Sequence, residues 1–386
     1  MNGKVIYFDN AATTKIDDEV LQSMMPFLTE SYGNSSSIHS FGKAAKVLLE
    51  DARDAIAAFI GASPKEIFFT NSGTEANNFA IKGLAFKFLN TQMNHIISTS
   101  IEHSAVLDTL KFLENKFKFK VTYLKPDIKG RISIDELSSN IREETFLIAV
   151  MHSNNEIGVI NDIKSISELT HEKNIFIHTD SVQSIGKTWF NVKDLDVNSA
   201  TLSAHKIYGP KGIAAVYIKD KTPVEKFIHG GMQERDMRGG TENIAAIAGF
   251  KKAIELIEKN YDSDIEHYQN LKSYLIRKLK DEFNDGVIFN SDEENSLPNI
   301  VNISFDPNKL IFDEEMILIQ FDLKGIAVSG GSACTAGTHK PSHVLTEIGR
   351  EKKTALGSVR VSFGRENKKA EIDYFIEMLR SIIKQK

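Results

Sequence analysis

The order of apolar and polar residues along the chain predicts short strands that alternate with amphipathic helices. Several strand candidates are apolar throughout, which is typical of strands buried on both faces of a largely parallel sheet. Helical spacing separates them, for example at 44–60 and 163–173. The predicted strands span 66–70, 95–99, 120–124, 146–151, 175–178, 200–203 and 213–218. This alternation predicts an α/β fold with a large, doubly wound domain and a mainly parallel sheet.

The pattern changes near residue 255. From there a long charged segment carries apolar residues at helical spacing, and shorter strand signals follow at 300–305 and 359–363. The chain closes on another amphipathic helix, with Ile372, Phe375 and Ile376 on one face. We therefore expect two domains. The large one covers 16–258, and a smaller α+β domain is made of 1–15 and 259–386.

Composition narrows the class of protein. The 386 residues include 47 basic and 52 acidic side chains, which gives a net charge of −5, and 41% are hydrophobic. These values are ordinary for a globular protein, and a net charge of this size gives no overall attraction for nucleic acid or an anionic membrane.

The cysteine content and the first residues indicate where the protein works. With one cysteine, Cys334, no intramolecular disulfide can form, which favours a reducing compartment. The first residues lack the apolar core of a signal peptide, and no apolar run is long enough to span a bilayer. We expect a cytoplasmic protein.

Two segments are similar to known binding motifs but lack residues that those motifs require. Gly186-Lys187-Thr188 is similar to the end of a phosphate-binding P-loop, but Ser181 stands where that motif requires its first glycine. A zinc site made of Cys334, His339 and His343 has suitable ligand types but lacks paired cysteines and the usual spacing. We therefore predict neither a P-loop nucleotide site nor a metal site.

Polar residues follow several of the predicted strands. Ligands in open α/β sheets sit beyond the carboxyl ends of the strands. After the strand at 66–70 comes a small polar turn that enters a helix, and its N–H groups with the Thr74 hydroxyl form an anion site. Alone, this turn would fit an ordinary helix cap equally well. Further polar segments follow later strands, at 152–158, 179–183 and 203–212.

Together these segments bring a carboxylate, a hydroxyl, an imidazole and an amine to one edge of the sheet, from Asp180, Ser203, His205 and Lys206. Pyridoxal 5′-phosphate (PLP) requires such a set. A lysine amine forms a Schiff base with it, a carboxylate keeps its pyridine nitrogen protonated, and helix-terminal groups hold its phosphate.

The same residues carry a family resemblance. Ser203-x-His205-Lys206-x-x-Gly209-Pro210-x-Gly212, with Asp180-x-x-Gln183 upstream, resembles the fold-type I PLP enzymes of the class V aminotransferase group. The segment from Ser329 through Cys334 to Leu345 resembles the mobile cysteine loop of NifS/IscS-type cysteine desulfurases. The resemblance covers nearly the whole chain. It implies a fold-type I architecture, with the cysteine loop at about 326–345 in the small domain.

The resemblance also implies roles for individual residues. Lys206 should hold PLP and move the substrate Cα proton, His103 should stack on the cofactor ring and could shuttle protons, and Cys334 should attack the substrate sulfur as a thiolate. Arg360 and Asn155 should bind the substrate, Arg360 by pairing with its carboxylate. The cofactor-binding residues should be Gly73, Thr74, His103, Asn155, Asp180, Gln183, Ser203, His205, Lys206 and Thr241.

The activity implied by the resemblance is that of a cysteine desulfurase. L-Cysteine would give L-alanine and a persulfide on Cys334, which passes to an acceptor protein for iron–sulfur cluster assembly, cofactor synthesis or tRNA thiolation. The counterpart of Thr241 reaches the phosphate bound by the other subunit, so a homodimer is implied. The enzyme alternatives are a selenocysteine lyase, which uses the same chemistry, and an aminotransferase, which would not need Cys334. An inactive scaffold on this fold would not need both Lys206 and Cys334. The acceptor is left open.

Overall fold

The main sheet contains seven strands in the computed structural model, which describes residues 5–331 and 340–386. Their spatial order is β2-β8-β7-β6-β5-β3-β4, and the strands from β7 to β4 are parallel. Strand β8 runs antiparallel to both of its neighbours. The predicted α/β fold with a mainly parallel sheet is therefore confirmed. The strands are β2 (Ile67–Thr70), β3 (His95–Thr99), β4 (Lys120–Leu124), β5 (Thr145–Ala149), β6 (Phe176–Asp180), β7 (Ser199–Ser203) and β8 (Ala214–Ile218).

One boundary difference affects the site. The predicted strand 175–178 is in fact β6, which continues to Asp180 because Thr179 and Asp180 pair with Ala200 and Thr201 of β7. The polar residues at the end of this strand thus belong to the sheet itself. Asp180 is consequently held by the sheet backbone rather than by a loop.

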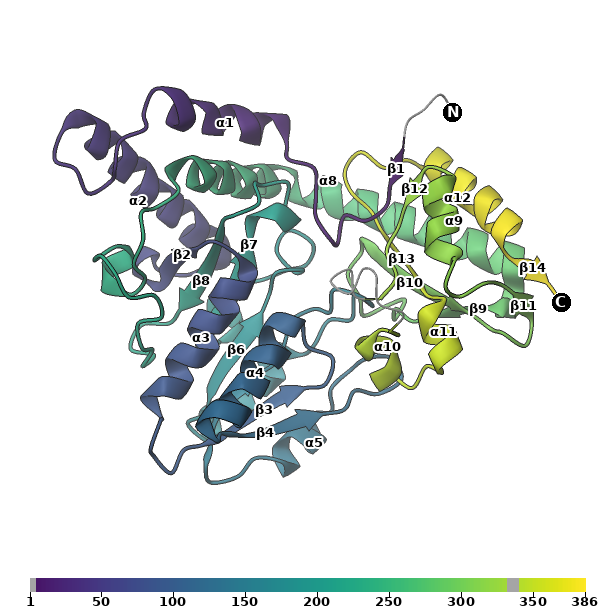
Figure 1. Cartoon of the computed structure of the whole chain (residues 1–386), viewed down its shortest axis with the longest axis horizontal. Helices are drawn as coiled ribbons and strands as arrows, with labels where there is room; N and C mark the ends of the chain where they lie inside the picture. Colours follow the sequence, from purple (N-terminus) through teal and green to yellow (C-terminus); the bar gives the residue numbers. More distant parts are fainter. Residues whose placement is uncertain (1–4, 332–339) are drawn as a thin grey trace.

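Helices cover both faces of this sheet (Figure 1). On one face lie α3 (Gly73–Lys87) and α4 (Ser104–Phe117). On the other lie α1 (Asp18–Thr29), α2 (Ser40–Ile60), α6 (Ile163–Glu172) and the first part of α8 (Ile244–Phe283). Strand β2 shows the alternation that follows, because Phe68 packs toward α3 while Ile67 and Phe69 pack toward α2. Burial on both faces explains why the strands are apolar throughout.

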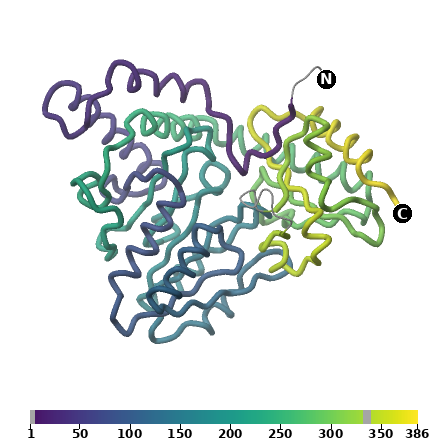
Figure 2. The backbone as a smooth tube through the Cα atoms, in the orientation of Figure 1, coloured from purple at the N-terminus to yellow at the C-terminus, as the bar shows by residue number. Residues whose placement is uncertain are grey.

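Helix α8 connects two separate hydrophobic clusters. Its residues up to Ile257 pack in the cluster of the main sheet, whereas Tyr268 and later residues pack with the C-terminal elements. Ile6 and Phe8, near the start of the described residues, join this second cluster, and Figure 2 shows this segment beside the C-terminal part of the chain. The change of pattern near residue 255 therefore reflects a change of packing partner within one continuous helix. The domain division at 258 and 259 stays a prediction.

Smaller elements complete the described fold. A three-stranded sheet has the order β13-β10-β9, from Val359–Ser362, Ile300–Phe305 and Val287–Phe289. Strand β1 (Ile6–Tyr7) pairs with β12 (Ile326–Ala327), and β11 (Leu310–Ile311) pairs with β14 (Lys384–Gln385). The remaining helices are α5 (Ile134–Ser139), α7 (Val192–Leu195), α9 (Ile317–Leu323), α10 (His343–Glu347), α11 (Lys352–Leu356) and α12 (Lys369–Ile382). None of the helices in 5–331 and 340–386 has the length and apolar character needed to span a membrane.

Candidate active site

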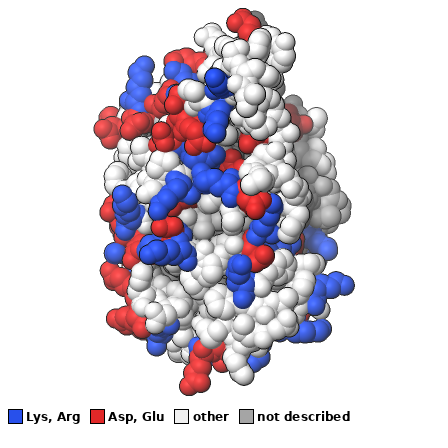
Figure 3. All heavy atoms as spheres, turned by 90° about the vertical axis from the view of Figure 1, so that its left-hand side faces the viewer, with Lys and Arg blue, Asp and Glu red and all other residues white. Residues whose placement is uncertain are grey.

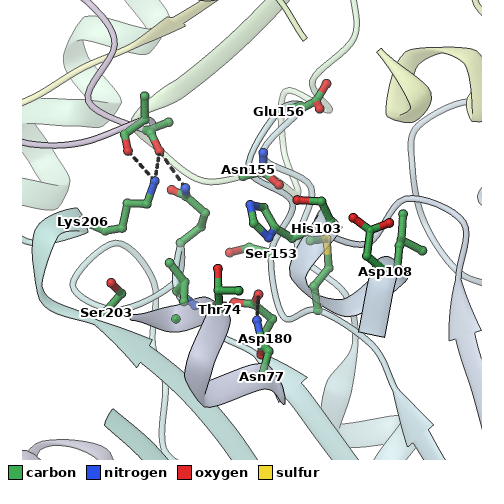
Figure 4. A pocket seen from close by; sticks show the side chains of 18 of the residues that line it. Thr74, Asn77, His103, Asp108, Ser153, Asn155, Glu156, Asp180, Ser203 and Lys206 are labelled. Carbon is green, nitrogen blue, oxygen red and sulfur yellow. Dashed lines mark hydrogen bonds between the residues drawn. The ribbon is translucent and has the colours of Figure 1, made fainter. Parts of the chain in front are cut away.

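A cavity of about 940 Å³ opens at the carboxyl ends of the parallel strands (Figure 4). It brings together residues that sequence reasoning proposed from widely separated segments. Those lining it are Gly73, Thr74, His103, Asn155, Asp180, Gln183, Ser203, His205, Lys206 and Arg360. Thr241 is exposed and does not line the cavity. Cys334 lies outside the described residues.

Lys206 stands on a short 3₁₀ turn that directly follows β7. Its Nζ donates hydrogen bonds to the carbonyl oxygens of Ala11 at 2.7 Å and Ala12 at 2.6 Å. Gln183 Nε2 donates to the same Ala11 oxygen at 2.9 Å, as the dashed lines of Figure 4 show. The N-terminal segment therefore closes one wall of the cavity and holds the amine of Lys206 at it.

Asp180 lies at the floor of the cavity and is 7% exposed. Its Oδ1 accepts a hydrogen bond from the backbone N–H of Val182 at 3.0 Å, and its Oδ2 accepts one from Asn77 Nδ2 at 2.7 Å. A carboxylate held in this way has remaining lone pairs for a donor inside the cavity. It is suited to accept the N–H of a protonated pyridine ring.

The N-terminus of α3 forms one end of the cavity. Ser72 caps this helix by accepting the N–H of Glu75 at 3.1 Å, and the N–H groups of its first turn are typical of an anion site. A Cβ on Gly73 would lie 3.1 Å from Val182 Cγ2, so the turn is closely packed beside the cavity. The hydroxyl of Ser203 is buried and has no hydrogen-bond partner among the described residues. An orphaned hydroxyl beside a helix N-terminus fits a bound phosphate group.

Burial lowers the pKa of two histidines that line the cavity. Burial is the largest cause that lowers the pKa of His205, to about 4, so its ring is neutral near pH 7. Burial also lowers the pKa of His103, whose Nδ1 accepts the N–H of Ala105 at 3.1 Å. The proton of a neutral His103 ring is therefore on Nε2. His343 also lines the cavity, and its Nε2 contacts the Glu102 carbonyl oxygen at 3.0 Å.

Arg360 brings a positive charge from β13 to the wall of the cavity. It is 1% exposed, and its Nη1 donates to the carbonyl oxygen of Asn155 at 2.7 Å. Its Nη2 donates to Asp9 Oδ1 at 2.8 Å. The planar guanidinium is thereby fixed at the cavity, with further N–H groups that suit a substrate carboxylate.

Sequence reasoning missed two buried groups at this site. Asn77 lies in α3, just after the polar turn that follows β2, and was given no role. It is 1% exposed and bonded to Asp180. Glu156 lines the cavity and accepts a hydrogen bond from Ser342, and burial raises its pKa. The sequence signal that could have identified Asn77 is a polar residue on the buried face of the helix that follows this turn.

The described residues contain no group of three or more His, Cys, Asp or Glu that could hold a metal ion. Cys334 and His339, two members of the zinc set rejected above, lie outside the described residues.

Comparison with known proteins agrees with the fold and the site. The model of the family "Aminotransferase class-V" matches residues 6–375. The chain therefore belongs to the class V aminotransferase family, and its cofactor is PLP. The orphaned Ser203 hydroxyl, the α3 N-terminus, Asp180 and Lys206 fit that cofactor.

The similar proteins are more specific. The chain is 46% identical over 385 residues to a cysteine desulfurase IscS of Clostridium botulinum, which covers 99% of this chain and 95% of that protein. It is 44% identical over 380 residues to the cysteine desulfurase IscS of Dictyoglomus turgidum, with 98% and 95% coverage. A solved structure of a NifS-like protein superposes with a TM-score of 0.90 at 37% identity, covering 98% of this chain and 99% of that one. Within the family, the chain thus groups with the cysteine desulfurases of the IscS type.

Proposed function

We propose that the chain transfers the sulfur of L-cysteine to Cys334 and releases L-alanine. The observation that carries this proposal is the convergence of Lys206, Asp180 and Arg360 on one cavity in a chain of this family. The carbon–sulfur bond of the substrate breaks, a sulfur–sulfur bond forms on the attacking thiolate, and the substrate Cβ takes up a proton. The two products are therefore alanine and a persulfide on Cys334.

PLP, when bound, supplies an electron sink for charge that develops on the substrate Cα. Lys206 holds the cofactor and moves the Cα proton, and Asp180 accepts the N–H of the ring nitrogen. Arg360 binds the substrate carboxylate, and hydrogen bonds to Asp9 and to the Asn155 carbonyl oxygen hold its guanidinium in place. His103 would contact the cofactor ring and shuttle protons through Nε2 within the cavity. The groups proposed to hold the phosphate and the ring substituents are Gly73, Thr74, Asn155, Gln183, Ser203 and His205.

The active form in this proposal is a homodimer. Large apolar side chains are exposed on α1, on α2 and on the segment between them, where Ile38 is 90% exposed and Tyr32 is 71% exposed. Figure 3 shows the side of the molecule on which these helices lie, where broad uncharged areas separate charged side chains of both signs. Large exposed apolar side chains gathered on neighbouring elements favour an interface between subunits. The exposed Thr241 would then contact the phosphate in the partner's cavity.

The persulfide on Cys334 passes to a sulfur-acceptor protein for iron–sulfur cluster assembly or for thiolation of a cofactor or tRNA. We place this transfer in the cytoplasm, because a cysteine that cycles between thiol and persulfide needs reducing surroundings.

Turnover of L-cysteine by the PLP-loaded protein with a thiol reductant tests the proposal. Alanine and sulfide should form in equal amounts, and both should disappear in Lys206→Ala and Cys334→Ala. Alanine and sulfide that still form at the wild-type rate in Cys334→Ala would contradict the role of the thiol. Selenocysteine, run in parallel, distinguishes a lyase from a desulfurase. An amino acceptor that raises product formation would instead indicate an aminotransferase.

A further inference from the structure

We propose that Asn77 and His178 are positioning residues that fix the Asp180 carboxylate against the cofactor ring nitrogen, through a hydrogen-bond chain that begins at Ser199. This inference rests on the proposed role of Asp180. It concerns Asn77 of α3, which lines the cavity beside Asp180, and His178 of β6 and Ser199 of β7, which do not line it. None of the three is expected to touch the substrate.

The chain has three links. Ser199 Oγ lies 2.9 Å from His178 Nδ1, His178 Nε2 lies 2.9 Å from Asn77 Oδ1, and Asn77 Nδ2 donates to Asp180 Oδ2 at 2.7 Å. Figure 4 shows Asn77 next to Asp180 at the cavity. All three side chains beneath Asp180 are at most 1% exposed. Water therefore has no access to replace any link.

The direction of every link follows from the donors and acceptors. Asn77 presents Nδ2 to Asp180, whose carboxylate oxygens are acceptors, and therefore presents Oδ1 to His178. His178 must then carry its proton on Nε2, and its Nδ1 accepts the hydroxyl proton of Ser199. Burial lowers the pKa of His178 to about 3, which keeps the ring in this neutral form. One orientation satisfies all three groups.

This arrangement restricts how the carboxylate can turn. Val182 N–H holds Oδ1 and Asn77 holds Oδ2, so rotation about the Cβ–Cγ bond of Asp180 would break two hydrogen bonds. The chain supplies neutral donors on the far side and leaves the cavity side for the charged ring nitrogen. Residues that orient metal ligands in the same way account for a 10- to 100-fold effect on affinity or activity, and we expect about the same range here.

The test uses apo-protein titrated with PLP labelled with ¹⁵N in its ring, measuring both affinity and the ring-nitrogen chemical shift. In Asn77→Leu and His178→Leu, PLP affinity should fall about 10- to 100-fold, and the shift should move toward the unprotonated nitrogen. His178→Gln keeps a donor for Asn77 and should recover part of both. Ser199→Ala removes only the first link, preserves the packing, and should give a smaller change of the same sign.

His95→Leu is the matched control. His95 is another fully buried histidine, on β3, with both ring nitrogens in contact with threonine hydroxyls, but it is not part of the chain to Asp180. Equal losses in His95→Leu and His178→Leu would overturn the inference, as would wild-type affinity and shift in Asn77→Leu. Asp180→Ala distinguishes a failure of the proposed role of Asp180 from a failure of this inference alone. If it leaves the ring nitrogen protonated, the proposed role of Asp180 fails and the inference falls with it. If Asp180→Ala deprotonates the ring nitrogen while Asn77→Leu does not, only the inference fails.

Discussion

Arg360 donates a hydrogen bond from Nη2 to Asp9 Oδ1 at 2.8 Å, although the two residues lie 351 positions apart. The acidic residue thereby orients the guanidinium that we propose for the substrate carboxylate. Asp9→Asn keeps the shape but removes the charge, which weakens this contact. We expect the KM for L-cysteine to rise about tenfold, with a smaller change in kcat. Steady-state kinetics measure both values, and an unchanged KM would show that Arg360 is held without Asp9.

Ser203 has a buried hydroxyl that lacks a partner among the described residues. Such a group costs stability until a ligand supplies the missing hydrogen bond. Ser203→Ala should therefore raise the melting temperature of the apo-protein slightly and lower its affinity for PLP about five- to tenfold. Thermal unfolding with and without PLP measures the two effects in one series. A variant destabilised in both states would indicate that the hydroxyl is already satisfied.

Glu102 gives the protein a defined dependence of stability on pH. Burial, the largest cause, raises its pKa from 4.5 to about 8, while Thr99 and the Met151 N–H donate to its Oε1. The folded state keeps the carboxyl protonated up to about pH 8, whereas the unfolded state loses the proton above 4.5. Its contribution to stability is therefore complete below 4.5 and declines as the pH rises toward 8.

Glu102→Gln cannot titrate and removes this decline. The melting temperature of Glu102→Gln relative to wild type should thus increase steadily across that pH range. A difference between the two that stays constant with pH would mean that Glu102 is ionised in the folded protein.

Mixed dimers test the proposed placement of Thr241 in the partner's site. A dimer of one Lys206→Ala subunit and one Thr241→Ala subunit contains one wild-type site only if Thr241 acts across the interface. We expect such mixed dimers to regain about half of the wild-type rate, while each variant alone stays impaired. Absence of recovery in purified mixed dimers would place Thr241 in its own subunit's site, whereas full activity of Thr241→Ala alone would place it outside both sites.

The sequence predicted those parts of the fold that depend on local pattern. Strands buried on both faces are apolar throughout, and polar residues cluster where these strands end, so the sheet and most of the cavity lining could be proposed. The antiparallel direction of β8 was not predicted, because an apolar run of residues does not indicate whether the strand runs parallel or antiparallel to its neighbours. Nor does a change of helical pattern show whether the helix ends or only changes its neighbours, as in α8.

The contacts that position the proposed catalytic groups could not be predicted from the sequence either. Asn77 meets His178 across 101 positions, and Arg360 meets Asp9 across 351. Neither pair has a characteristic spacing, since each forms only after separate elements pack together. The resemblance supplied roles for Lys206, Asp180 and Arg360, but not the residues that hold them in place.

The most direct test of the central claim is a single turnover of L-cysteine without reductant, followed by mass spectrometry of the intact and digested protein. The account predicts a mass increase of one sulfur atom on the peptide that contains Cys334, with one alanine released for each sulfur retained. The adduct should be removed by a thiol and absent from Lys206→Ala. Alanine released with no sulfur on Cys334, or sulfur bound equally by Lys206→Ala, would contradict the account.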